Sequence, residues 1–206
     1  MSPRRLAAVL AVTVPLAAGC GSTSLFGAKS KSTSSTTTPA SSAGATVTQP
    51  APQPPGVTSI DGSFQTIVPS GFVDATRSVR SGVANVQYLA IGPRANGFAS
   101  NINVIREPAG GRTDINRITG LEVATIKRID PRADRFSQPS SITVGGQPAR
   151  AVDYYNRPTG ERLLRQRQVF VAHGRWIYTI TYSALPEAYA AGVGAVDRVA
   201  AGWKWL

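Results

Sequence analysis

The sequence predicts an α+β fold built around a mostly antiparallel β-sheet. Short segments with alternating apolar residues come first, a helical pattern interrupts them, and further strands, a second helix and a short final strand follow. The turn pairs Asn96-Gly97 and Gly145-Gly146 join neighbouring strands by short connections. Short connections favour antiparallel pairing, because parallel strands need long crossovers.

The first three strands are predicted at residues 64–68, 83–91 and 98–105. Pro69 stops the first strand, and the pairs Gly92-Pro93 and Asn96-Gly97 are both predicted as turns between the second and the third. In the third strand Asn101 and Asn103 alternate with apolar residues, so we expect them on an exposed polar face.

A helix is predicted over residues 115–129, where apolar residues recur at three- and four-residue steps. Thr113-Asp114 supplies a start suited to capping, and Pro131 follows the end. Gly120 lies inside this segment and costs about 1 kcal/mol of helix stability relative to alanine.

Strands are predicted again at residues 142–144, 149–155, 163–172 and 175–183. Between the last two, His173-Gly174 is predicted as a two-residue hairpin loop. A final helix begins near Pro186 and ends at Gly202, and residues 203–205 close the chain as a short strand.

Residues 1–20 have the pattern of a secretory signal. Arg4 and Arg5 precede an uncharged run over residues 6–19, which is too short for a permanent transmembrane helix of about 20 residues. The junction Leu-Ala-Ala-Gly-Cys that ends at Cys20 resembles the lipobox of bacterial lipoproteins, whose cysteine receives a diacylglyceryl thioether. The resemblance implies a lipid anchor at Cys20, the only cysteine of the chain. The alternative is a plain secreted protein with a chance cysteine near its cleavage site.

Two further segments complete the predicted organisation. Residues 21–56 are rich in Ser, Thr, Ala, Gly and Pro and cannot bury enough apolar surface to fold, so they are predicted to be a disordered tether. Such a tether spans on the order of 35 Å. Residues 57–206 have the size of one globular domain.

The composition limits the classes of partner. The formal net charge is +11, and removing residues 1–20, which carry two arginines and no acid, leaves +9. A basic surface attracts anionic lipid head groups, phosphorylated glycans or acidic proteins, and we expect no nucleic-acid partner for an exported chain. With one cysteine the chain forms neither an internal disulfide nor a thiolate metal site.

Several short motifs follow one another in the order of a known fold between about Ser63 and Trp205. They read FQTIVPSGF, SNINVI, TVGGQPARAVDY, RQRQVFVAHGRWIYTITYSA and WKW. In this order they resemble the Mog1/PsbP-like fold, and in particular the LpqN/LpqT-type lipoproteins of actinobacteria. Phe72 stands where this family commonly has tryptophan. The resemblance implies an α-β-α sandwich with a central antiparallel sheet, and binding or accessory roles without a shared catalytic set.

The residues favour a binding protein over an enzyme. His173 is the only histidine and lies at a predicted hairpin tip, and neither GxSxG, HExxH nor a P-loop motif occurs. Asp130 and Asp134 lie among arginines, where ion pairing is the simpler role. We therefore expect no cofactor and no metal, and a lipid-anchored envelope protein on the extracytoplasmic face of the membrane. The alternative is a hydrolase that acts on envelope polymers.

The last hairpin carries the candidate binding site. With His173-Gly174 as its loop, Arg165 would face Tyr182 and Arg167 would face Ile180, on one face of the sheet. The predicted site is an aromatic-lined groove with an arginine clamp for an anionic or carbohydrate ligand on an envelope protein, lipid or glycan. Its residues are Arg165, Arg167, Trp176, Tyr178 and Tyr182. The alternative is that the arginine stems cover the core while their heads reach water.

Overall fold

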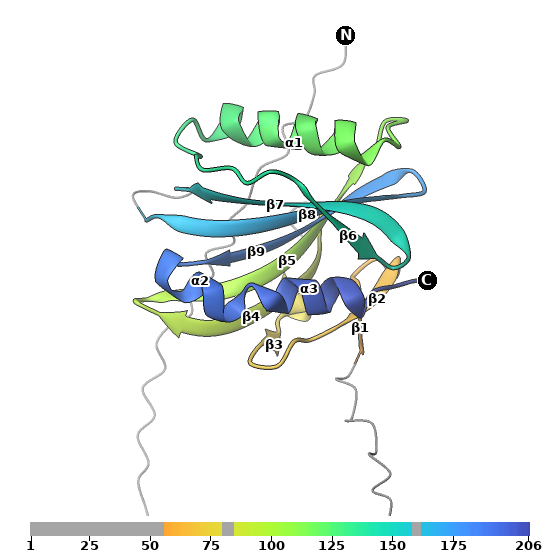
Figure 1. Cartoon of the computed structure of the whole chain (residues 1–206). Helices are drawn as coiled ribbons and strands as arrows, with labels where there is room; N and C mark the ends of the chain where they lie inside the picture. The colour runs from red at the N-terminus through yellow and green to blue at the C-terminus, as the bar shows by residue number, and fades with distance from the viewer. Residues whose placement is uncertain (1–55, 80–84, 158–161) are drawn as a thin grey trace, which may run out of the picture. The chain divides into compact units, whose positions relative to one another are not determined.

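The computed structural model describes residues 56–79, 85–157 and 162–206, which form two antiparallel sheets with helices on both sides (Figure 1). The predicted signal segment, Cys20 and residues 21–55 of the predicted tether lie outside the described residues.

The larger sheet has seven strands in the order β3-β4-β5-β9-β8-β7-β6. Its strands are β3 (Val73–Asp74), β4 (Val86–Ala95), β5 (Phe98–Pro108), β6 (Ser140–Val144), β7 (Gln147–Asn156), β8 (Leu164–His173) and β9 (Trp176–Ala184). Every neighbouring pair in it is antiparallel, and short turns join β4 to β5, β6 to β7 and β8 to β9, as predicted.

The smaller sheet joins the first and the last described strands. β1 (Gly56–Thr58) pairs with β2 (Phe64–Ile67), and β2 pairs with β10 (Lys204–Trp205). The Thr66 hydroxyl donates to the Val199 carbonyl at 2.7 Å, which fixes this sheet to the last helix.

Three α-helices and one 3₁₀ turn lie among the described residues. They are α1 (Ile115–Ile129), α2 (Pro186–Gly192), α3 (Gly194–Ala201) and η1 (Thr76–Ser78). The Asp114 side chain caps α1 by accepting from the backbone N–H of Asn116 at 2.9 Å. The predicted final helix is instead two helices that meet at Val193. Gly192 approaches Tyr182 so closely there that a Cβ would overlap the tyrosine hydroxyl.

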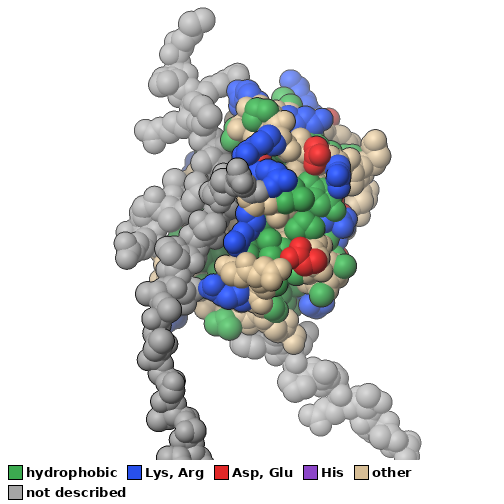
Figure 2. All heavy atoms as spheres, turned by 90° about the vertical axis from the view of Figure 1, so that its left-hand side faces the viewer, with side chains coloured by type: hydrophobic (Ala, Val, Ile, Leu, Met, Phe, Trp, Pro, Cys, Tyr) green, Lys and Arg blue, Asp and Glu red, His purple; other side chains and the backbone are tan. Residues whose placement is uncertain are grey.

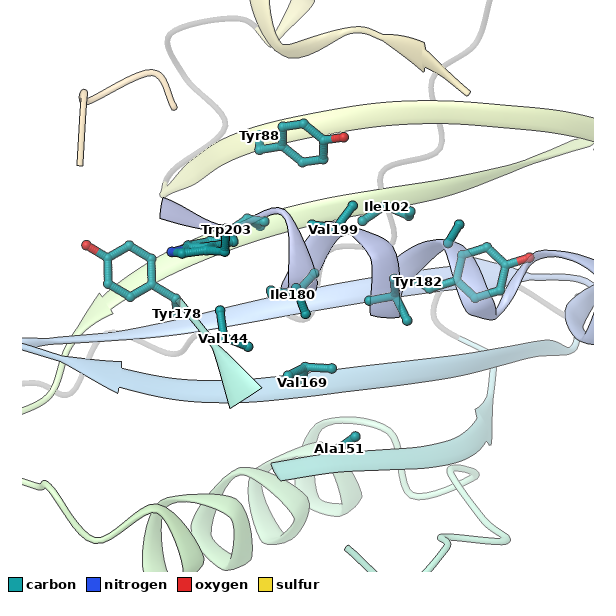
Figure 3. Close-up of a cluster of buried hydrophobic side chains, with 14 of the residues drawn as sticks. Tyr88, Ile102, Val144, Ala151, Val169, Tyr178, Ile180, Tyr182, Val199 and Trp203 are labelled. Atoms are coloured by element: carbon teal, nitrogen blue, oxygen red, sulfur yellow. The ribbon is translucent and has the colours of Figure 1, made fainter. Parts of the chain in front are cut away.

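Helices α2 and α3 lie on one face of the large sheet and α1 on the other (Figure 1). The α2/α3 side holds the main core, where Val169 and Ile180 of the sheet pack beneath Val199 of α3 (Figure 3). On the other side Ile118 of α1 packs on Ile177. The α+β class and the α-β-α sandwich are thus confirmed.

An aromatic cluster joins the small sheet to this core. Phe64 of β2 is fully buried and stacks on Trp203 with ring centroids 3.8 Å apart. The rings of Phe64 and Tyr178 form a T-shaped pair with centroids 5.9 Å apart. Trp205 donates from Nε1 to the Gly145 carbonyl at 2.9 Å. Packing on Phe64 therefore fixes Trp203, and the hydrogen bond to Gly145 fixes Trp205.

Two turn predictions need correction. Gly92-Pro93 lies inside β4, at an irregularity of pairing between Ile91 and Arg94, and only Asn96-Gly97 makes the turn. In the last hairpin His173 pairs with Trp176, so the loop is Gly174-Arg175 and the predicted register was wrong by two residues. The reason is that Gly174 has a φ of +56°, which suits the first position of a two-residue loop.

The expected exposed face of β5 is also wrong. Asn101 and Asn103 are 2% and 3% exposed. β5 lies inside the sheet between β4 and β9, so side chains of both neighbouring strands flank these two residues. Asn101 Oδ1 and Asn103 Nδ2 have no hydrogen-bond partner among the described residues.

Candidate functional site

The five residues of the predicted site share one face of the sheet but do not form one group. Tyr178 and Tyr182 are each 1% exposed and belong to the main core, so they do not line an open groove. Arg165 pairs with Ala184, whereas Trp176 pairs with His173, eight residues farther along β8. Eight residues of strand span about 26 Å. Arg165 and Trp176 therefore lie at opposite ends of the sheet.

Arg167 is held by two carboxylates. Its Nε lies 3.2 Å from Asp153 Oδ1, and one terminal nitrogen lies 3.1 Å from Asp197 Oδ2 on α3. These pairs neutralise the guanidinium and attach α3 to β8. The geometry matches the structural role for this residue more closely than a clamp for a ligand.

Arg165 lies in a different environment, between two aromatic rings. Its guanidinium carbon is 4.1 Å from the centroid of the Tyr189 ring and 5.5 Å from that of Tyr155. Its Nε is buried and has no hydrogen-bond partner in the described part of the chain, and no described carboxylate forms an ion pair with it. Cation–π contact orients the guanidinium without using its N–H donors.

A second arginine extends this arrangement. The guanidinium of Arg135 lies 5.1 Å from the centroid of Tyr155, on which Arg165 also lies. Arg135, Tyr155, Arg165 and Tyr189 therefore alternate, and we call these four residues the arginine–tyrosine ladder. Tyr155 and Arg165 are direct partners across β7 and β8, while Tyr189 comes from α2.

Backbone contacts hold the loop that carries Arg135. Asp134 and Tyr155 exchange two backbone hydrogen bonds at 2.9 and 3.0 Å. The Asp130 carboxylate accepts from the Arg157 backbone N–H at 2.9 Å, and Arg132 donates to the Arg157 carbonyl at 2.8 Å. The loop after α1 is thus fixed to the end of β7, which places Arg135 beside Tyr155.

The Tyr189 hydroxyl is a fixed donor. It donates to Asp153 Oδ1 at 2.8 Å. Burial raises the pKa of Tyr189 well above its ordinary value, and the neighbouring Asp153 carboxylate raises it further. The hydroxyl therefore stays protonated at physiological pH and keeps its ring against Arg165.

Arginines surround the ladder at this end of the domain, which Figure 2 views from outside. The exposed cations on the adjoining segments are Arg94, Arg132, Arg135 and Arg162. Arg162 lies by the β4–β5 turn, close to Gly97. Two exposed acids, Asp134 and Glu187, accompany them. This end, which we call the basic end, therefore attracts anions.

Sequence reasoning missed three members of the ladder. Tyr189 lies in the predicted final helix and Tyr155 in the strand predicted at residues 149–155, and neither element carried a predicted site. Arg135 is one of the arginines around Asp130 and Asp134 for which ion pairing was expected, and its pair with Asp134 is long, at 3.9 Å. The sequence could have indicated the site through the pairing of Tyr155 with Arg165 across neighbouring strands. That pairing can be predicted only when the register of β7 and β8 is known.

His173, the only histidine of the chain, packs against a tryptophan ring. His173 stacks on Trp205, with ring centroids 4.1 Å apart and planes 4° from parallel. Among residues 56–79, 85–157 and 162–206, no three His, Cys, Asp or Glu side chains gather as metal ligands. None of the described helices is long and apolar enough to cross a membrane.

Two glutamates on the α1 side of the large sheet make the stability of the domain depend on pH. Burial raises the pKa of Glu107 on β5 and of Glu122 on α1 above the ordinary value of 4.5. The charge of Glu107 raises the pKa of Glu122 further, while Arg112 lowers both. The folded state thus binds protons more tightly than the unfolded state, so stability falls as the pH rises from 4.5 through the raised pKa values.

We expect Glu122→Gln to raise the melting temperature near neutral pH and to make it less dependent on pH. At about pH 4 both carboxyls are largely protonated, so variant and parent should melt alike. Thermal unfolding followed by circular dichroism across this range measures the effect, and Glu187→Gln on the exposed side of α2 is the matched control. A gain that is the same at every pH would contradict this account.

The described elements define a protein of the Mog1/PsbP-like fold, an α-β-α sandwich with a central antiparallel sheet. Among the solved structures that are similar to it, three each cover 74% of this chain. LpqN, involved in cell envelope biogenesis of Mycobacterium tuberculosis, has a TM-score of 0.55, 15% identity and 90% of its chain covered. Cyanobacterial PsbP from Synechocystis sp. PCC 6803 has a TM-score of 0.54, 12% identity and 92% of its chain covered. The Ran-binding protein Mog1p of Saccharomyces cerevisiae has a TM-score of 0.51, 13% identity and 95% of its chain covered.

No protein-family model matches the sequence, and no curated protein does. At these identities the similarity establishes the fold alone.

Proposed function

We propose that the protein is a lipid-anchored component of the cell envelope whose domain binds an anionic group at the arginine–tyrosine ladder, without catalysis. The observation that carries the binding site is Arg165, a half-buried cation held between two rings with no described carboxylate partner. The lipobox pattern at Cys20 and the fold shared with LpqN, a protein involved in cell envelope biogenesis, support the location.

The ladder suits a phosphate or carboxylate group on an envelope protein, lipid or glycan. Guanidinium groups present directed N–H donors, and the surrounding rings exclude part of the water that would screen the interaction. The basic end raises the local concentration of such groups. The ladder supplies two cations. The Tyr189 hydroxyl already donates to Asp153, and its raised pKa keeps it protonated and a weak nucleophile, so the geometry favours binding over hydrolysis.

A titration of the isotope-labelled protein with glycerol phosphate tests the proposed site. We expect saturable shifts of the amide signals of Tyr155 and Arg165, which weaken as salt is added. Arg165→Ala should lower the affinity by about tenfold or more, because a charged donor is lost. Arg117→Ala removes an exposed arginine of α1 and is the control for net charge.

The Arg165→Ala variant should still unfold cooperatively near the melting temperature of the parent. Equal shifts in the two variants, or no saturable shift in the parent, would overturn the ladder as an anion site. If the site holds, crosslinking in living cells, compared between the parent and Arg165→Ala, identifies the envelope component that carries the anionic group.

A further inference from the structure

The end of the domain opposite the ladder exposes apolar and aromatic side chains. Leu206 is 71% exposed and Ile60 is 54% exposed, both unusually high for large apolar residues. Trp176 and Trp205 lie beside them and are half-buried. Apolar surface of this kind, combined with tryptophan, often marks an interaction surface.

These residues belong to one continuous surface. The backbone N–H of Leu206 donates to the Ser63 carbonyl at 3.1 Å, which links β10 to the loop that contains Ile60 and Asp61. Asp61 forms an ion pair with Arg106, whose guanidinium lies 4.1 Å from the Trp176 ring centroid.

The second link runs through the last hairpin. His173 pairs with Trp176 across the hairpin and stacks on Trp205. β10, the last hairpin and the loop after β1 therefore meet in one place. We call this surface the docking end, and its exposed and half-exposed residues are Ile60, Arg175, Trp176, Lys204, Trp205 and Leu206.

The docking end is also basic. Arg175 lies 5.2 Å from the Trp176 ring centroid on the exposed hairpin loop, and Lys204 is exposed on β10. The acids nearby are Asp61, which Arg106 neutralises, and Glu107, which interacts with Arg112. Arg175 and Lys204 thus form no ion pair with a described acid.

The position of the tether favours a membrane as the partner of the docking end. β1 begins at Gly56, where the predicted tether from Cys20 joins the domain, and the shared partner β2 places it in one small sheet with Lys204 and Trp205. A chain anchored at Cys20 would thus enter the small sheet at Gly56, which pairs with Ile67, and would reach the docking end at Ile60, just after β1.

We propose that the docking end rests on an anionic lipid surface. The two indole rings would lie at the level of the head groups, Ile60 and Leu206 would enter the apolar layer, and Arg175 and Lys204 would contact phosphates. The arginine–tyrosine ladder, about 26 Å away along β8, would then point away from the membrane. This inference rests on the lipid anchor of the proposed function.

Quenching of tryptophan fluorescence by brominated lipids tests the docking end. The full-length lipidated protein is reconstituted in vesicles of phosphatidylglycerol and brominated phosphatidylcholine. We expect clear quenching in the parent, and a loss of at least about half of it when Ile60→Ser and Leu206→Ser are combined, because apolar burial drives the insertion. Val73→Ser, at a residue that is also 71% exposed but lies on β3, is the control and should quench like the parent.

A second pair of variants tests the charges. Arg175→Glu combined with Lys204→Glu should reduce quenching in vesicles that contain phosphatidylglycerol, whereas Arg117→Glu on α1 should not. Trp176→Phe and Trp205→Phe assign the quenched signal, since Trp203 is buried.

The outcomes separate the docking end from the anchor. A lipidated protein that floats with the vesicles but shows no quenching, or equal quenching in the paired serine variant, overturns the docking end and leaves the anchor intact. If the purified protein carries no lipid, the anchor is wrong. The same quenching measured with the unlipidated protein and excess vesicles then decides the docking end independently.

Discussion

Replacing Phe64 by alanine should strongly destabilise the domain. Phe64 is fully buried, stacks on Trp203 at 3.8 Å and forms a T-shaped pair with Tyr178, so its loss leaves a cavity where the small sheet joins the main core. Truncation of a buried phenylalanine costs about 3–5 kcal/mol. For a domain of this size that corresponds to a fall in melting temperature of roughly 10 °C.

Thermal unfolding of the domain measures this effect, and Phe136→Ala is the matched control. Phe136 also stacks on a tyrosine, Tyr154, with ring centroids 5.1 Å apart, but it is only half-buried. Its truncation should cost clearly less, because less apolar area is lost. If Phe64→Ala melts with the parent, or no lower than Phe136→Ala, the packing of the small sheet on the core is misassigned.

The fold class followed from local patterns because the local and tertiary preferences agree in this domain. Alternation placed β2, β5 and β8 at nearly their observed bounds, and Asp114 caps α1 as its sequence position predicts. Antiparallel pairing followed from turn residues, since Asn96 and Gly97 adopt the positive φ angles that a tight hairpin requires.

The errors in the fold came from features that depend on distant residues. Glycine and proline mark both turns and irregular strand positions, so the sequence alone does not place Gly92-Pro93 inside β4. The interruption between α2 and α3 depends on Tyr182, which lies beneath Gly192 and belongs to another element. Nothing in the helical periodicity of residues 186–201 indicates that contact.

The candidate site was predicted only in part for a related reason. Arg165 was identified because a charged residue on an otherwise apolar strand face needs a partner or water. Its rings come from β7 and α2, and the pairing of Tyr155 with Arg165 depends on the connection between β7 and β8. Arg167 looked equivalent along the strand, but Asp153 and Asp197 reach it from β7 and α3.

The largest expected effect in cells concerns the anchor. Cys20→Ala removes the only thiol that could carry the lipid, so the protein should disappear from the membrane fraction. It should appear instead as an exported protein in the soluble fraction. The docking end alone should not hold it there, because a few apolar and basic residues without a lipid give only reversible binding. Cell fractionation with immunodetection measures the distribution, and Ser22→Ala, two residues beyond the cysteine, is the control.

The mass of the N-terminal peptide tests the central claim, that lipid on Cys20 anchors the domain to the membrane, most directly. The protein is purified from membranes of the native host, digested, and its N-terminal peptide analysed by mass spectrometry. The account predicts a chain that begins at Cys20 and carries a diacylglyceryl group in thioether linkage to the cysteine sulfur. A chain that begins at another residue, or a Cys20 with a free thiol, would contradict it.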